Sequence, residues 1–131
     1  MKIQFSQPKY RGTKLASQIH DLLYAVITPK YRQGLLVKIL FYTGLNRKAD
    51  WNGNYRNIWR HGFYDNEWNM KGIDSIITLK VGFEVPPDKL LYLIAHETGH
   101  HILGRQDKRG GEKRADKLAE KLIKRYEVKQ C

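Results

Sequence analysis

The chain has 131 residues, a formal net charge of +11 and a single cysteine, Cys131. This length fits one domain with its own hydrophobic core, and one cysteine excludes a disulfide framework within the chain. The N-terminus lacks the apolar run of a signal peptide, and no stretch approaches the roughly 18 apolar residues of a membrane span. We therefore expect one domain over residues 1–131, located in the cytoplasm and not in a membrane.

The positive charge is distributed unevenly. Residues 1–60 contain eleven Lys and Arg against two acids, and residues 105–131 contain ten against five. Between them, residues 61–104 contain three basic and six acidic residues. Basic surfaces attract phosphate backbones, so the two basic segments make nucleic acid a candidate partner. The alternative interpretation is a solvated surface with no partner.

Two elements are predicted in the first third of the chain. Apolar residues at helical spacing predict an amphipathic helix over residues 12–27, which Pro29 ends. The apolar run at residues 35–42, bounded by Gly34 and Gly44, predicts a buried strand.

Residues 43–72 are polar and rich in turn formers, and Asn52-Gly53 is the clearest turn signal. One or two short strands are expected there. Aromatic residues punctuate this region, and we expect them to pack over the sheet, with an aromatic-lined groove as the alternative: Trp51, Tyr55, Trp59, Phe63, Tyr64 and Trp68.

Three elements are predicted in the remainder of the chain. Alternating apolar residues predict a half-buried strand over residues 76–83. Pro86-Pro87-Asp88 then opens a helix, because proline is tolerated in a first turn and Asp88 can cap it, and Gly104 ends this helix. A last helix follows Gly110-Gly111, with an apolar stripe along one face: Ala115, Leu118, Ala119, Leu122, Ile123 and Tyr126.

The most informative motif lies in the helix that begins near Pro87. Residues 96–100 read His-Glu-Thr-Gly-His, an H-E-x-x-H pattern. Residues four apart share one face of a helix, so His96 and His100 can bind one metal ion. Glu97 then lies where a carboxylate can take a proton from a water molecule on that metal. The pattern predicts a catalytic Zn²⁺ site with Glu97 as general base.

Catalytic zinc usually has a third protein ligand, and the last helix offers one. Glu112 and Asp116 lie four residues apart beside the apolar stripe, so both can face the histidines. We expect Glu112 to bind zinc and Asp116 to hold one imidazole in place. One alternative is Asp107 as third ligand. The other is a structural role, in which Glu112 is an acid favoured by the helix dipole and Asp116 pairs with Lys113 or Lys117. His101 points about 100° away from His100 and is expected to pack or to face solvent.

These residues resemble a known group of proteins. Residues 96–104 are similar to the H-E-L-G-H-x-x-L-G stretch of ImmA/IrrE-type metallopeptidases, and residues 112–119 are similar to their downstream E-x-x-A-[N/D]-x-x-A helix. SprT-like zincins are a more distant likeness. The resemblance covers residues 76–123 and implies a small gluzincin in which His96, His100 and Glu112 bind zinc. It also implies a mobile-element origin and protein substrates.

We therefore predict an α+β, zincin-like fold. A small, mostly antiparallel sheet is expected to pack against an N-terminal helix, the motif helix and a C-terminal helix. The predicted activity is hydrolysis of peptide bonds in a protein or peptide substrate by a zinc-activated water. The strand at 76–83 is expected to bind an extended substrate at a sheet edge. Candidates for stabilising the oxyanion are His61, Tyr64 and Tyr92.

Two other functions stay open on the sequence. The first is a nucleic-acid-binding or regulatory module with a structural or vestigial zinc site. The second is a basic viral or plasmid interaction protein that binds no metal. Zinc content and salt-dependent binding of nucleic acid distinguish the three hypotheses.

Overall fold

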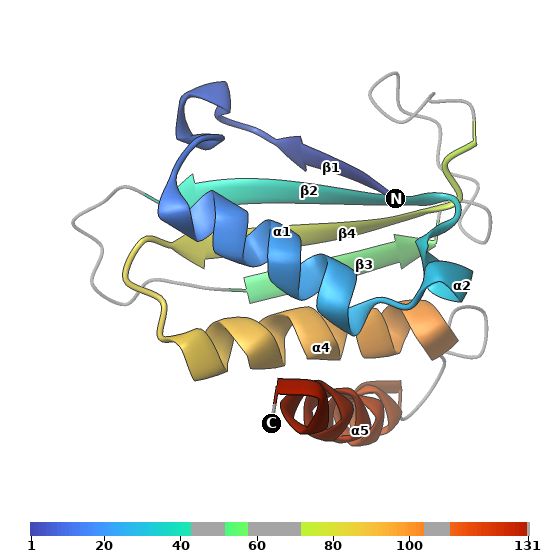
Figure 1. The fold of residues 1–131 in the computed structure, drawn as a ribbon. Helices are drawn as coiled ribbons and strands as arrows, with labels where there is room; N and C mark the ends of the chain where they lie inside the picture. Colours follow the sequence, from blue (N-terminus) through green and yellow to red (C-terminus); the bar gives the residue numbers. More distant parts are fainter. Residues whose placement is uncertain (43–51, 58–71, 104–110, 131) are drawn as a thin grey trace.

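The computed structural model describes residues 1–42, 52–57, 72–103 and 111–130 (Figure 1). Their elements form three layers. A sheet lies on one side, helices α1 and α4 cover one of its faces, and α5 packs on the side of α4 away from the sheet. In chain order the elements are β1 (Lys2–Phe5), the short 3₁₀ helix η1 (Pro8–Tyr10), α1 (Lys14–Val26), α2 (Pro29–Arg32), β2 (Leu35–Tyr42), β3 (Asn52–Asn57), β4 (Ser75–Gly82), α4 (Pro87–Leu103) and α5 (Gly111–Gln130).

The sheet is mixed and has the strand order β1-β2-β4-β3. β2 pairs in parallel with both β1 and β4, and only β3 runs antiparallel to its neighbour β4. The prediction of a mostly antiparallel sheet is therefore wrong. The reason lies in the connection from β1 to β2, because a crossover through α1 returns the chain to the end of the sheet where it started and so makes the pairing parallel.

The order of the strands corrects a second expectation. β4 was expected to offer a sheet edge, but it lies between β2 and β3. Among the described strands, β3 is the outer one on this side, and it also contacts α4.

The turn predicted at Asn52-Gly53 is also wrong. Both residues belong to β3 and pair with Lys80 and Leu79 of β4. The turn propensity of this dipeptide is outweighed by the backbone pairing that β4 offers along the whole of β3. The predicted aromatic packing involves side chains outside the described part of the chain.

The predicted helix over 12–27 and the strands at 35–42 and 76–83 are confirmed as α1, β2 and β4. The Thr13 side chain caps α1 by accepting a hydrogen bond from the Ala16 amide. β4 is more buried than expected, because Ile76 on the face away from the helices is also buried.

Alternate residues of the two central strands build the core. They pack with α1 and α4 in one cluster of buried apolar side chains, which includes Ile19, Leu23, Val37, Ile39, Phe41, Ile77, Leu79, Val81, Leu90 and Ile94. This core fixes α4 against the sheet, and α4 carries the candidate site.

α4 begins at Pro87, with proline in its first turn as predicted. Asp88 lies inside that first turn and not at the cap position expected for it, which Pro86 occupies. The glycine expected to end it, Gly104, lies outside the described residues. α5 begins at Gly111, also as predicted. No helix within the described ranges has both the length and the apolarity needed to cross a membrane.

Candidate metal centre

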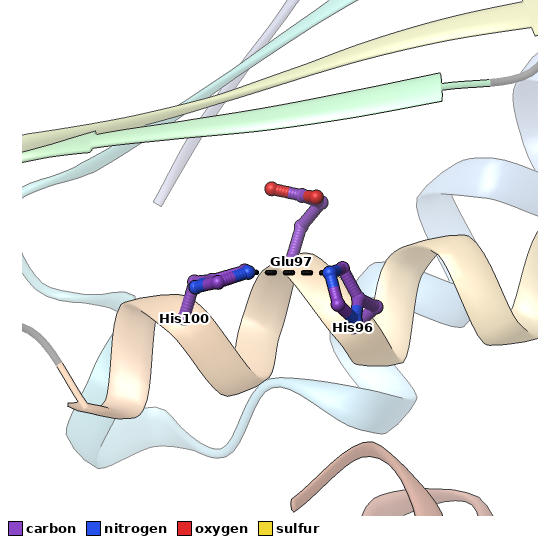
Figure 2. A group of neighbouring side chains, drawn as sticks. All are labelled: His96, Glu97 and His100. Atoms are coloured by element: carbon purple, nitrogen blue, oxygen red, sulfur yellow. Dashed lines mark hydrogen bonds between the residues drawn. The ribbon is translucent and has the colours of Figure 1, made fainter. Parts of the chain in front are cut away.

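α4 presents His96 and His100 on one face, one helical turn apart. Their Nε2 atoms lie 3.2 Å from each other (Figure 2). Both side chains are largely buried, with exposed fractions of 15% and 10%. Glu97 is 4% exposed, and one ligand atom from each of the three residues lies within 4.8 Å of the other two. His96, Glu97 and His100 therefore form a group that could hold a metal ion.

The neighbouring helix α5 brings two carboxylates to the same place. Glu112 Oε1 lies 3.0 Å from His100 Nε2, and Glu112 Oε2 lies 3.2 Å from His96 Nε2. Asp116 Oδ1 lies 2.9 Å from His96 Nδ1. The structure thus gathers all five residues singled out from the sequence. The rival third ligand, Asp107, lies outside the described residues.

A close contact between helix backbones allows these short side chains to meet. A Cβ atom on Gly99 would lie 2.8 Å from the Ala115 carbonyl oxygen, so only glycine fits there without a shift. Ala115 and Ala119 on α5 are fully or almost fully buried. Small residues thus let α5 approach α4 closely at the level of the histidines. The sequence analysis identified the alanines but not the role of Gly99. The available indication was the presence of a glycine in the interior of a predicted helix.

The spacing of the nitrogen and oxygen atoms was tested against a zinc ion. Zinc binds imidazole nitrogen and carboxylate oxygen at about 2.0–2.2 Å, and tetrahedral geometry then separates the ligand atoms by about 3.3–3.6 Å. The two Nε2 atoms lie 3.2 Å apart, and each lies 3.0–3.2 Å from a different carboxylate oxygen of Glu112, Oε1 for His100 and Oε2 for His96. These separations are within a few tenths of an ångström of that requirement, so the two imidazoles and the Glu112 carboxylate could hold a metal ion such as zinc.

Asp116 fixes the tautomer of His96, that is, which of its two ring nitrogens carries the proton. Hydrogen bonds from the Tyr92 hydroxyl and from His96 hold the pKa of Asp116 below its usual range. An ionised carboxylate only accepts hydrogen bonds, so His96 Nδ1 carries the proton that it donates to Asp116. In the neutral ring, Nε2 is then unprotonated and available to a metal.

Tyr92 contacts both Asp116 and His96. Its hydroxyl donates to Asp116 Oδ1 at 2.7 Å, and its ring stacks on the His96 ring with centroids 5.8 Å apart. The hydrogen bond to Asp116 is the main reason that the pKa of Tyr92 rises to about 12. We expected Tyr92 only as one candidate oxyanion stabiliser, whereas it supports His96 through Asp116. Its spacing of four residues from His96 was the available signal. The other two candidates, His61 and Tyr64, lie outside the described residues.

His101 points away from the centre, as expected. Its Nε2 lies 2.7 Å from the Tyr31 carbonyl oxygen, and its Nδ1 lies 3.2 Å from Ser75 Oγ. Burial lowers its pKa. His101 therefore ties the last turn of α4 to α2 and β4.

Comparisons with protein-family models, curated protein sequences and solved structures gave no match.

Proposed function

We propose that this protein is a zinc-dependent metallopeptidase. In this proposal His96, His100 and Glu112 hold the zinc, Glu97 is the general base, and Asp116 orients His96. The observation that carries the proposal is the position of Glu112, whose carboxylate on α5 lies 3.0 and 3.2 Å from the imidazole nitrogens of α4.

The ligand set supports a catalytic rather than a structural site. Two imidazoles and one carboxylate are a known catalytic set, and three protein ligands leave one coordination position open. The Glu112 side chain is 76% exposed, so the centre can be reached from solvent on this side. When bound, zinc supplies a Lewis acid that polarises the scissile carbonyl and makes water a nucleophile near neutral pH.

Glu97 is suited to proton transfer. It follows His96 directly, and its carboxylate points from α4 toward the sheet, away from Glu112's helix (Figure 2). In this mechanism Glu97 takes a proton from the attacking water as the new C–O bond forms. It then gives that proton to the leaving amine as the C–N bond breaks. The low exposure of Glu97 keeps bulk water from competing for the proton.

β3 supports a peptide as the substrate. One side of β3 pairs with β4, and no strand among the described residues pairs with its other side. β3 also contacts α4, the helix that carries the histidines. An extended peptide that adds to this edge would form backbone hydrogen bonds regardless of its side chains. This edge replaces the one expected at residues 76–83.

We also propose kinship with ImmA/IrrE-type metallopeptidases, and more distantly with SprT-like zincins. Its support is the pair of motifs at residues 96–104 and 112–119. On this proposal the natural substrate is a folded protein, such as a transcriptional repressor, rather than a short peptide.

The test is the Glu97→Gln variant, which keeps the shape of the side chain and removes the base. We expect near-stoichiometric zinc by elemental analysis in the wild type and the variant, both purified without a histidine tag. Hydrolysis of a peptide library should fall by about 10²–10⁴-fold. The exposed Glu84 provides the matched control, because Glu84→Gln removes the same charge outside the centre.

Three results would contradict the proposal. Unchanged turnover in Glu97→Gln would reject the general base. Loss of zinc together with activity would make Glu97 a ligand instead. Stoichiometric zinc without hydrolysis in the wild type would favour the regulatory module with a structural or vestigial site.

A further inference from the structure

The outer face of α5 carries a row of lysines, here called the lysine ridge: Lys113, Lys117, Lys121 and Lys124. At 100° per residue, the four fall within an arc of about 80°, and at 1.5 Å per residue they extend over about 16 Å. All four are exposed. They form a continuous strip of positive charge along one helix.

The lysine ridge faces away from the rest of the described chain. The residues that α5 buries, such as Ala115, Ala119 and Leu122, lie on the opposite side of the helix. α5 is also the outermost layer of the fold (Figure 1). Glu112 and Asp116 lie about a third of the way round the helix from the ridge, so the metal centre and the ridge occupy different flanks of α5.

The arrangement of charge differs from that of an ordinary solvated helix. Lys113, Lys117 and Lys121 place like charges four residues apart, whereas acids at helical spacing from the ridge, Asp116 and Glu120, stand along one edge of it. Lys113 also lies in the first turn, where the helix dipole disfavours a cation. The acids Glu120 and Glu127 lie on the flank nearer to Asp116. The four lysines thus share one strip of the helix surface, and the acids of α5 lie to one side of it.

We infer that the lysine ridge binds the phosphate backbone of double-stranded nucleic acid. Phosphate contacts by lysine need charge and exposure but no apolar surface. The ridge provides both in a chain whose net charge is +11. This inference goes beyond the proposed peptidase and does not depend on zinc.

The composition of this face argues against other partners. An amphipathic helix inserts into a membrane surface through an apolar face, and the apolar face of α5 is buried in the fold. The centres of protein–protein interfaces are enriched in aromatic residues and depleted of lysine. The ridge contains no aromatic side chain on which the bases of a single strand could stack. A duplex backbone, bound without reading its sequence, remains the best match.

The experiment measures binding of the full chain to a fluorescent 20-base-pair DNA duplex at increasing salt. With about four phosphates neutralised, the slope of log K against log salt should be about −3.6. Replacing all four ridge lysines with glutamine should weaken binding at least tenfold and bring the slope close to zero. The control replaces four exposed lysines outside α5 with glutamine, namely Lys2, Lys9, Lys14 and Lys89, and should lose less than threefold.

Several results would overturn the inference. The first is no duplex binding by the wild type. The second is an equal loss of duplex affinity in the ridge variant and the control variant. The third is an affinity for anionic phospholipid vesicles, or for polyglutamate, equal to that for the duplex. Zinc content and peptide hydrolysis should be unchanged in the ridge variant. A failure of the peptidase proposal would therefore be visible separately from a failure at the ridge.

Discussion

α4 has two contact surfaces that are built differently. Toward the sheet and α1 it packs large apolar side chains, such as Leu90 and Ile94, into the main core. Toward α5 it packs Gly99 against the Ala115 backbone, with His96 and His100 beside that contact. Large side chains provide burial and hence stability. Small residues provide proximity, which lets short carboxylates reach the histidines. We infer that stability depends mainly on the first surface and metal binding on the second.

The largest effect is expected from a substitution that disturbs only the surface of α4 facing the sheet and α1. Leu90 on α4 is buried in the core, and Leu90→Ala should lower the free energy of unfolding by about 2–5 kcal/mol. Urea denaturation of the metal-free protein measures this loss. Zinc affinity, measured by competition with a chelator at a temperature where the variant is folded, should change less than threefold. A parallel collapse of zinc affinity would mean that the two surfaces are not separable.

The second prediction breaks the contact between the helices. Gly99→Ala places a Cβ 2.8 Å from a backbone oxygen, so α4 and α5 must separate. We expect a loss of about 1–3 kcal/mol in unfolding free energy, as for an overpacked core, together with a loss of zinc affinity of at least tenfold.

Gly12→Ala is the matched control for this prediction. A Cβ there would meet nothing within 4 Å, so neither quantity should fall. Wild-type zinc affinity in Gly99→Ala would show that the close approach of the helices does not build the centre.

The third prediction concerns the carboxylate behind His96. Asp116→Asn removes the negative charge from the side chain that accepts a hydrogen bond from His96 Nδ1. This change should weaken zinc binding about 10–100-fold. The unfolding free energy without metal should change by less than about 1 kcal/mol, because Asp116 is half exposed. Glu120→Gln, one turn further along α5, is the control and should bind zinc like the wild type. Equal affinities in the two variants would remove Asp116 from the site.

The smallest expected effect belongs to Tyr92. Tyr92→Phe keeps the ring stacked on His96 and removes the hydroxyl that donates to Asp116. One hydrogen bond contributes about 1 kcal/mol, so zinc affinity should fall by up to about fivefold. The exposed Tyr24 on α1 provides the control Tyr24→Phe, which should leave zinc affinity unchanged. A larger loss than in Asp116→Asn would show that Tyr92 acts on the centre by another route.

The centre was largely predictable from the sequence because its parts are local on two helices. Residues four apart share a helix face, which pairs His96 with His100 and Glu112 with Asp116. The apolar stripe of α5 then indicated which flank would face α4. Only the distances between the helices needed the structure, because they depend on the contact of Gly99 with Ala115.

The sheet was less predictable because strand pairing is not local. The apolar runs located β2 and β4, but their parallel pairing depends on how the connections between strands cross the sheet. β1 was missed, although Ile3 and Phe5 alternate with Lys2 and Gln4, because four residues give a weak periodic signal. Asn52-Gly53 shows the opposite error, in which a strong turn signal was outweighed by pairing with β4.

The central claim is that α5 completes a zinc centre on α4, and anomalous diffraction at the zinc edge tests it most directly. Crystals of zinc-loaded protein should show one anomalous peak about 2.0–2.2 Å from His96 Nε2, His100 Nε2 and a carboxylate oxygen of Glu112. The absence of a peak, or a peak whose third ligand is Asp107 or any other residue in place of Glu112, would contradict the account.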